Sequence, residues 1–291
     1  MKTTRRGFEV VRSPGALAVR KWILLCLLAC VLAVCGSAME APLFIAVSAA
    51  VQQAPEPAHP VAKSQQERDD FNQAYALTNA KAAEAAANEF SAKYPGSDLR
   101  HYLYSNAMLR YQQENNPAKM LEMGEKVLTL DQDNPLALVL TATAVADGLG
   151  DHERDRERKV GIVKRNANRA IQVAETSFSS SGAPGAALYK TTLQAMAYSA
   201  LGIAKLKTGD DAGAEKDLMT AAELRKIRPD AYVWYHLALA QDHRKKYAAA
   251  LNSVEQALQL ASSNPELQKL AEAEHERLFS LARAPRNAGP Q

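Results

Sequence analysis

Apolar positions in the C-terminal part of the chain recur three and four residues apart, which predicts amphipathic helices. Between Ala231 and Leu260, one apolar stripe begins at Trp234 and a second at Tyr247, and the polar residues 243–246 separate them. Two short helices joined by such a break predict an antiparallel helical hairpin. Alanines in both stripes let two helix axes approach closely, so we expect the pair to be tightly packed.

The same pattern occurs 36 residues upstream, in the segment 195–228. At this single offset Tyr198 matches Trp234 and Ala214 matches Ala250, and five further pairs match as well. A constant offset indicates an internal repeat. The predicted break in this copy is Thr208-Gly209-Asp210, which is typical of one helix ending and another beginning. The aromatic, apolar and small positions that define the two copies are Tyr198, Leu201, Gly202, Ala214, Ala221, Trp234, Leu237, Ala238, Tyr247, Ala250 and Ala257.

This order of an aromatic residue, a leucine and a small residue, followed by tyrosine, alanine, an apolar residue and alanine, resembles the tetratricopeptide repeat, whose unit is about 34 residues long. The resemblance implies an all-α fold, a right-handed solenoid of helical hairpins over 66–283. The implied units are 64–97, 101–134, 135–177, 195–228 and 231–264. The second unit departs from the family pattern at Met120 and Gly124, where a large and a small residue exchange places. The third unit is a degenerate copy with an insertion.

In the third unit, a run of alternating charges at 151–159 precedes an apolar stripe. We expect a second helix here that is longer than a standard repeat allows, with its charged end in solvent. On such a helix Asp155 is placed to pair with Arg158 or Lys159. The segment 176–185 is predicted to be a loop, because it is rich in serine, glycine and proline.

After the last unit, the pattern predicts a capping helix over 266–283. Such a helix covers the apolar surface that the final hairpin of a solenoid would otherwise expose. The leucines expected on its buried face are Leu267, Leu270, Leu278 and Leu281. The segment 284–291, with two prolines and a glycine, is predicted to be a flexible tail.

The first 50 residues differ in kind from the rest. Six basic residues and one acidic residue precede the apolar run 22–34. Small residues at 36–38 and 48–50 offer cleavage sites, so 1–50 is predicted to be a signal peptide. If neither site is cut, residues 22–51 are long enough to anchor the chain in the inner membrane. In both cases the positive charges hold the N-terminus inside, and the later residues reach the periplasm or are secreted.

Finer signals in this leader leave the export route open. Thr4-Arg5-Arg6-Gly7-Phe8 resembles a twin-arginine signal, but the apolar run begins well after it, so we favour a chance match. Lipidation at Cys30 or Cys35 would make the protein a lipoprotein. We favour instead an ordinary apolar role for both cysteines. The proline-containing segment 51–65 is predicted to be a linker.

Cysteine and charge together exclude several classes of function. All three cysteines lie before residue 36, so the exported part has no disulfide, thiolate metal site or cysteine nucleophile. The leader holds 6 of the 35 basic and 2 of the 32 acidic residues, which leaves 29 basic and 30 acidic residues in the remainder. The net positive charge therefore belongs to the leader and does not indicate nucleic-acid binding.

Candidate chemistry is sparse in the rest of the chain. The segment 275–279 resembles the start of a zinc-binding HExxH motif, but Phe279 stands where the second histidine is needed. His236 and His243 are too few to hold a metal alone. No glycine-rich phosphate loop follows a predicted strand, because no strand is predicted. We therefore predict no enzyme, no metal and no cofactor.

The family resemblance implies a concave groove, lined by the first helix of each hairpin, in which a peptide or helix of another protein binds. The groove positions carried over to this sequence are Tyr102, Ser105, Leu109, Gln112, Ser199, Ile203, Lys207, Tyr232, Tyr235, Leu239 and His243. Aromatic rings on a rigid scaffold would be suitable anchors for a partner. The alternative for each tyrosine is that its ring packs against a neighbouring helix, and the sequence leaves both open. We therefore predict a protein-binding scaffold of the bacterial periplasm. The alternative is an architectural subunit whose repeats self-associate as a homo-oligomer or pack within an envelope assembly.

Overall fold

The computed structural model describes residues 62–150, 154–178 and 185–283. The leader at 1–50, most of the predicted linker and the tail at 284–291 lie outside the described residues. Within the described ranges all regular secondary structure is helical, as predicted. None of the helices in these ranges combines the length and the apolar content that a bilayer crossing requires.

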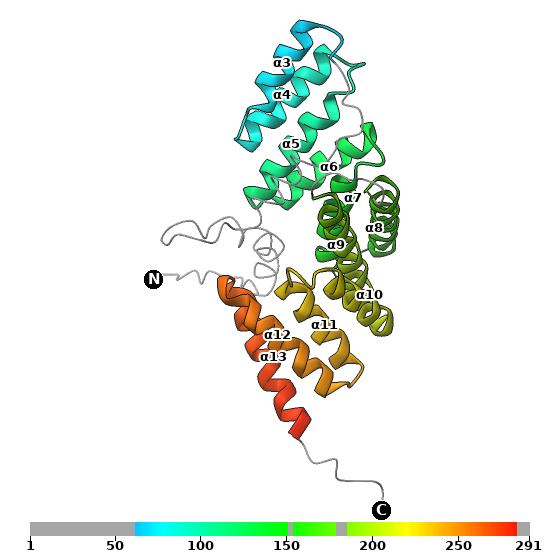
Figure 1. Ribbon diagram of the computed structural model, residues 1–291, viewed down its shortest axis with the longest axis vertical. Coiled ribbons are helices and arrows are strands. Elements are labelled where there is room, and N and C mark those ends of the chain that lie inside the picture. The colour runs from blue at the N-terminus through cyan, green and yellow to red at the C-terminus, as the bar shows by residue number, and fades with distance from the viewer. Residues whose placement is uncertain (1–61, 151–153, 179–184, 284–291) are drawn as a thin grey trace, which may run out of the picture.

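The helices pack as tandem pairs along the long axis of the molecule (Figure 1). The pairs are α3 (Gln65–Tyr75) with α4 (Ala80–Lys93), α5 (Arg100–Gln113) with α6 (Pro117–Leu130), α7 (Pro135–Asp147) with α8 (Arg156–Phe178), α9 (Ala186–Lys207) with α10 (Asp211–Leu224), and α11 (Ala231–His243) with α12 (Tyr247–Leu260). A 3-10 turn (Ala261–Ser263) and α13 (Pro265–Arg283) follow. The second helix of each pair contacts the first helix of the next, so the hairpins form one continuous array. The right-handed sense of the array stays a prediction.

Short polar side chains begin several of these helices. The side chains of Asn79, Asn116 and Asn134 each accept a hydrogen bond from the backbone N–H three residues later, and Asp210 does the same. Each cap satisfies a backbone donor that has no partner inside the helix, which contributes about 1 kcal/mol. These residues therefore set where the second helices α4, α6 and α10 and the first helix α7 start.

The turn inside a hairpin has the same geometry in three of the five pairs. Asn115, Gly209 and Lys245 occupy its centre with φ values of 60°, 81° and 60°. In each turn the next residue donates its N–H to the carbonyl oxygen five residues earlier, at 2.9 Å. This is the Schellman arrangement that ends a helix on a left-handed residue. Gly209 and Lys245 are 36 residues apart, so the repeat seen in the sequence is also a repeat of backbone conformation.

Small residues lie where the two helices of the later hairpins cross. A Cβ atom added to Gly202 of α9 would lie 2.6 Å from Cγ of Leu218 on α10, within the fourth hairpin. One added to Gly124 of α6 would lie 2.6 Å from Cγ2 of Thr141 on α7, where the second hairpin meets the third. In the second hairpin, the side chains that face Gly124 are those of Thr141 and Met108, and Met120 is buried on the same helix. The small signature positions with no exposed surface are Ala214, Ala221, Ala238, Ala250 and Ala257.

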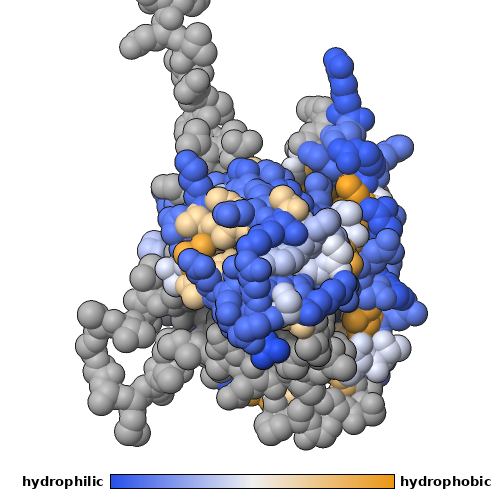
Figure 2. Space-filling model, turned by 90° about the horizontal axis from the view of Figure 1, so that it is seen from above, coloured by the Kyte–Doolittle hydropathy of each residue, from blue (hydrophilic) through white to orange (hydrophobic). Residues whose placement is uncertain are grey.

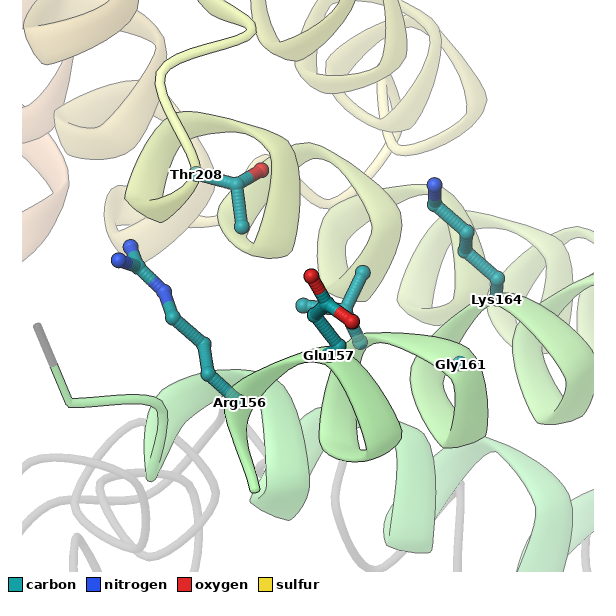
Figure 3. Close-up of a pocket in the computed structure, with 6 residues that line it drawn as sticks. Arg156, Glu157, Gly161, Lys164 and Thr208 are labelled. Carbon is teal, nitrogen blue, oxygen red and sulfur yellow. The ribbon is translucent and has the colours of Figure 1, made fainter. Parts of the chain in front are cut away.

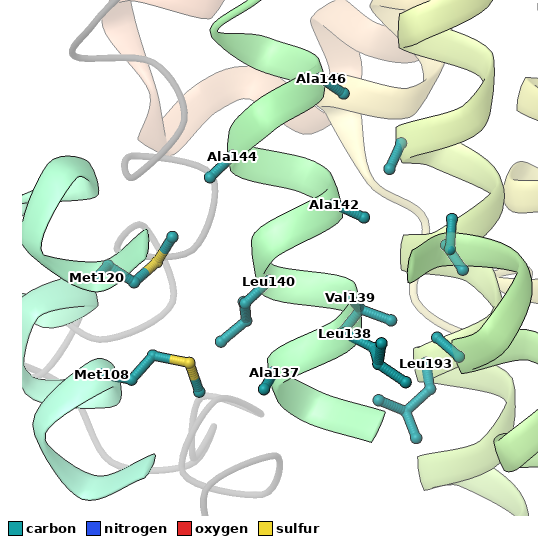
Figure 4. Close-up of a cluster of buried hydrophobic side chains, with 14 of the residues drawn as sticks. Met108, Met120, Ala137, Leu138, Val139, Leu140, Ala142, Ala144, Ala146 and Leu193 are labelled. Atoms are coloured by element: carbon teal, nitrogen blue, oxygen red, sulfur yellow. The ribbon is translucent and has the colours of Figure 1, made fainter. Parts of the chain in front are cut away.

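Helix α7 lies at the centre of the largest buried cluster. It packs against α6, α8 and α9, and Val139, Ala142 and Ala146 have no exposed surface. Met108 and Met120 approach it from one side and Leu193 from the other (Figure 4). A helix that is apolar all round has to be enclosed by other helices. The sequence of α7 thus requires the neighbours that the fold provides.

Helix α8 is longer than a standard repeat allows, as predicted, whereas the length of α9 was not predicted. Helix α8 has 23 residues and α9 has 22, whereas α4, α6, α10 and α12 have 14 each. The predicted loop at 176–185 is wrong at its start, because α8 continues to Phe178. Helix α9 begins at Ala186, directly after the predicted loop and before the start of the predicted unit 195–228. The ring of Phe178 contacts that of Tyr189 edge-on at 5.1 Å. This contact joins the end of α8 to the start of α9.

The charged start of α8 also differs in part from the prediction. Asp155 pairs with Arg158 at 2.5 Å and lies 3.8 Å from Lys159, as expected. However, Arg156 donates a hydrogen bond to the carbonyl oxygen of Lys207 at the end of α9. The first turn of α8 is therefore attached to the next hairpin and does not simply project into solvent.

Helix α13 packs on α12 and α11, but only half of its predicted leucine face is buried. Leu267 and Leu278 have no exposed surface, whereas Leu270 is 42% and Leu281 is 37% exposed. The buried stripe steps from Leu267 through Ala271 to Leu278, and Leu270 and Leu281 lie at the edge of that stripe.

The opposite end of the array, where α3 and α4 lie, is covered mainly by hydrophilic side chains (Figure 2). Gln65, Arg68 and Asp69 of α3 are exposed. A polar outer face is what the terminal unit of a helical array needs in order to remain soluble.

Candidate functional site: the inner face of the first helices

The predicted groove residues lie on the first helices α5, α9 and α11, and we call these positions the inner face. On α5, Tyr102, Leu109 and Gln112 are half-buried. The ring of Tyr102 stands edge-on to that of Phe71, with 6.5 Å between the ring centroids. Burial raises the pKa of the Tyr102 hydroxyl. The Oγ atom of Ser105 is buried and finds no hydrogen-bond partner in the described part of the chain. This part of the inner face therefore keeps surface on an aromatic, an aliphatic and an amide side chain.

The inner face of α9 does not offer the surface that was predicted. Ile203 has no exposed surface and Ser199 is 7% exposed, so neither side chain is available to a partner. The reason is that α9 is surrounded by α7, α8 and α10. Lys207 is half-buried, and its Nζ donates to the carbonyl oxygens of Asp147 at 2.5 Å and Leu149 at 3.3 Å. It thus binds the C-terminal end of α7, where a cation is favoured.

On α11 the predicted positions divide into two groups. Tyr232 and Tyr235 are half-buried, and burial raises the pKa of Tyr235 to about 12. Tyr235 packs against the clusters formed by α12 and α13. Leu239 is half-buried against the main core, and His243 is exposed with its Nδ1 2.9 Å from Asp211. The last hairpin therefore keeps part of its inner face accessible, although Tyr235 also supports the fold.

The structure brings two inner-face residues, Lys207 and Tyr232, to a residue that the sequence did not single out. Asp147, the last residue of α7, accepts a hydrogen bond from the hydroxyl of Tyr232 on Oδ1 at 2.6 Å. Its Oδ2 is buried and has no hydrogen-bond partner among the residues that the structure describes. His236 lies one turn after Tyr232 and donates from Nδ1 to the carbonyl oxygen of Tyr232 at 2.9 Å. We call these four residues the Asp147 cluster.

Burial controls the protonation of the Asp147 cluster. Asp147 is 4% exposed, and desolvation raises the pKa of its carboxyl to about 6 against the opposing effects of Tyr232 and Lys207. His236 is 9% exposed, and desolvation lowers the pKa of its imidazole to about 4. Both groups thus resist becoming charged, as expected away from water.

The Asp147 cluster contains group types that serve in acid–base catalysis, but its geometry indicates a structural role. General acid–base chemistry needs a group within hydrogen-bond reach of a substrate. Here Tyr232 is bonded to Asp147, Lys207 to backbone carbonyls, and His236 to the backbone of its own helix. No group of three or more potential metal ligands occurs within the described ranges. The cluster therefore joins α7, α9 and α11.

One signal in the sequence points to this cluster. Asp147 ends a helix whose other positions are almost all apolar. A carboxylate at a helix C-terminus faces the negative end of the helix dipole, which is unfavourable unless a cation or donor is nearby. Lys207 and Tyr232 supply these groups from distant positions in the chain. The need for partners was thus visible, but their identity depended on the fold.

No protein-family model matches the chain, and no curated protein sequence matches it. Among solved structures it is similar to TTC0263, a thermophilic TPR protein of Thermus thermophilus, with a TM-score of 0.44 and 16% identity over 72% of this chain and 98% of that chain. It is also similar to MamA from Desulfovibrio magneticus RS-1, with a TM-score of 0.38 and 18% identity over 64% and 97% of the two chains. A MamA RS-1 double mutant gives a TM-score of 0.39 and 16% identity over 64% and 96%. The tetratricopeptide-like character of the fold rests on the chain's own hairpins, which share turns and crossings 36 residues apart.

Proposed function

We propose that the protein is a non-enzymatic helical-repeat scaffold that binds a peptide or helix of another protein on its inner face. The observation that carries the proposal is the difference between the ends and the middle of that face. Tyr102, Leu109 and Gln112 on α5 and Leu239 and His243 on α11 keep accessible surface, whereas α9 has none to offer at Ser199 and Ile203. An aromatic anchor with adaptable polar neighbours on a rigid helix is the usual composition of a protein-binding site.

The proposed location is the bacterial cell envelope, outside the inner membrane. This part of the proposal is supported by the leader alone, with its six early basic residues and the apolar run 22–34. Retention of 22–51 would attach the scaffold to the membrane, and cleavage would release it into the periplasm. Cell fractionation followed by mass spectrometry of the mature N-terminus distinguishes cleavage, retention and lipidation.

The inner face is tested most sharply at Gln112. Gln112 is half-buried on the inner face of α5, whereas the neighbouring Gln113 is exposed about 100° further round the same helix. Gln112→Arg places a long charged side chain where a partner would lie, and Gln113→Arg is its matched control. We expect Gln112→Arg to reduce partner recovery from envelope extract at least threefold, with recovery by Gln113→Arg close to that of the wild type.

Both variants should melt within a degree or two of the wild-type protein, since neither residue is fully buried. Equal recovery by all three proteins would remove the inner face as the binding site. Tyr235 is a poorer choice for this test, because it packs against α12 and α13 and its truncation would also loosen the fold.

One observation favours the alternative, an architectural subunit that self-associates. Helix α13 exposes three large apolar side chains, Leu270, Phe279 and Leu281, at 42%, 40% and 37%. A terminal helix with a polar outer face would not need a partner, but this one leaves apolar area in water. If the alternative holds, the protein sediments as an oligomer and Leu270→Lys converts it to a monomer. A monomeric wild-type protein at micromolar concentration would rule it out.

A further inference from the structure

A second surface, away from the inner face, has the features of a binding site. A cleft of about 450 Å³ lies between the first half of α8 and the turn that links α9 to α10 (Figure 3). The residues that line it are Arg156, Glu157, Val160, Gly161, Lys164 and Thr208. Arg156 and Lys164 rise from α8 on either side of Glu157, toward the segment that carries Thr208. Val160 and Gly161 lie between these charged ends, so the cleft has an apolar middle.

The helix that forms this cleft is the most basic part of the described chain. Residues 154–169 contain seven basic and two acidic residues, a net charge of +5, whereas residues 62–150 contain eight basic and twelve acidic residues, a net charge of −4. Lys164 and Arg165 are exposed and form no ion pair within the described ranges. By contrast, Arg169 of the same helix is held by Asp133 at 2.6 Å. Positive charge that is unneutralised and concentrated next to a cleft attracts an anionic ligand.

Gly161 is the second observation that points to a ligand. It lies inside α8, where glycine lowers helix stability relative to alanine. A Cβ atom added at this position would meet nothing within 4 Å among the described residues, so their packing does not require a glycine here. At Gly124 and Gly202 the packing does require a glycine, because an added Cβ would collide with a side chain of the neighbouring helix. A helix glycine without a packing reason, in the floor of a cleft, allows the backbone of a ligand to approach closely.

We propose that this cleft binds an acidic segment of a protein partner. Carboxylates of the segment lie at Lys164 and Arg165, and its main chain passes over Gly161 beside Val160. The inference rests on the proposed function and adds the chemistry of the partner. A recessed site with an apolar middle suits an extended peptide better than a membrane surface, which is flat on this scale. Glu157 at the rim repels a carboxylate placed at the Arg156 end, and this directs the acidic side chains toward Lys164.

The first test measures binding of a fluorescein-labelled hexaglutamate peptide to the full-length protein by fluorescence anisotropy at low ionic strength. The variant Lys164→Glu/Arg165→Glu reverses two charges beside the cleft. The control Lys216→Glu/Lys226→Glu reverses two exposed charges on α10 and the turn after it, with the same change in net charge. We expect at least tenfold weaker binding for the first variant and less than threefold for the control. Equal weakening by both would show long-range charge attraction without a site, and would overturn the proposal.

The second test is Gly161→Ala. Because alanine is the better helix former, this variant should raise the melting temperature by about 2 to 4 °C. Its Cβ occupies the floor of the cleft, so peptide affinity should fall at least fivefold although the fold is more stable. Unchanged affinity together with the higher melting temperature would overturn the proposal.

The remaining arms separate other occupants and the proposed function itself. If Lys164→Glu/Arg165→Glu weakens the binding of phosphatidylglycerol vesicles more than it weakens the binding of the peptide, the site belongs to lipid. If the wild-type protein is a dimer and this variant is a monomer, the site belongs to a second copy of the chain. Either result overturns the proposal. Gln112→Arg should bind hexaglutamate like the wild type. Loss of partner recovery by Gln112→Arg with normal peptide binding by Lys164→Glu/Arg165→Glu would leave the inner-face function standing and remove only the cleft.

Discussion

The last hairpin, α11–α12, and the third hairpin, α7–α8, are built on the same plan but present different surfaces. Helices α11 and α12 have 13 and 14 residues and meet at a tight turn centred on Lys245. Helix α7 is enclosed by α6, α8 and α9, and α8 is extended to 23 residues. The last hairpin therefore keeps accessible side chains on its inner face. The third hairpin has become the core of the molecule.

This difference shows that a repeat preserves local geometry more strictly than it preserves function. Positions that pack inside a hairpin are equivalent from copy to copy, because each pair of helices must cross closely. Positions on the inner face depend on how many other helices approach, so Ile203 is fully buried while Leu239 is not. A binding surface carried over from one repeat to the next is thus reliable only where the neighbours are the same.

The shared crossings are tested with the largest expected effect by tryptophan substitutions at small positions. Ala250→Trp and Ala214→Trp should each destabilise the protein by about 3 kcal/mol or more, because neither side chain has space around it. The matched controls Ala248→Trp and Ala212→Trp change exposed alanines of the same two helices and should cost less than about 0.5 kcal/mol. Urea unfolding followed by circular dichroism gives the comparison. Wild-type stability in either buried variant would refute the common register.

Two buried titratable groups lie where the enclosed third hairpin meets the last hairpin: Asp147 at the end of α7 and His236 on α11. The pKa of Asp147 is raised to about 6, so its contribution to stability is full below about pH 4 and is lost as pH rises through 6. The pKa of His236 is lowered to about 4, so its contribution is full above about pH 6.5 and is lost as pH falls through 4. The two effects oppose each other between these limits.

Substituting one residue at a time should therefore reveal opposite slopes. Relative to the wild type, Asp147→Asn should gain up to about 3 kcal/mol of unfolding free energy as pH rises from 4 to 7. Over the same range His236→Gln should lose a similar amount relative to the wild type. Unfolding measured at several pH values supplies both differences. If the plots of unfolding free energy against pH stay parallel to that of the wild type, the pKa of neither group changes on folding.

The hydrogen bond across the middle gives an intermediate effect. Tyr232→Phe leaves both carboxylate oxygens of Asp147 without a side-chain donor from the described ranges, which should cost about 2 kcal/mol at pH 7. Tyr198→Phe on α9 removes a hydroxyl from another half-buried tyrosine and serves as the control, with an expected cost below about 0.5 kcal/mol. Equal melting temperatures for the two variants would show that the contact between α7 and α11 is not stabilising.

The smallest effect sharpens what the hairpins have in common. Lys245 and Asn115 have positive φ angles at the centre of their turns. Gly209 occupies the equivalent position in its own hairpin, where glycine adopts this conformation without strain. Lys245→Gly and Asn115→Gly should stabilise the protein by about 0.5 to 1 kcal/mol, and Gly209→Ala should destabilise it by about 1 kcal/mol. Chemical unfolding of the three variants measures these shifts. A destabilised Lys245→Gly would mean that its side chain contributes more than its backbone costs.

The amino-acid sequence alone determined the helical class, the 36-residue repeat and the small residues at the helix crossings. These features are local: periodicity sets the helix faces, and a small residue at a fixed offset permits a close crossing whatever lies further away. The turn at Thr208-Gly209-Asp210 and the pair Asp155–Arg158 belong to the same class, since their partners are a few residues apart in the chain.

Only the tertiary structure decided which surfaces remain accessible. The burial of Ile203, the partners of Asp147 and the cleft beside Gly161 depend on helices that are far away in the sequence. The exposure of Leu270 and Leu281 depends on how far α13 rotates against α12. Burial depends on contacts from all neighbouring helices. A periodic pattern indicates only the direction in which a side chain points, and not which distant helices pack against it.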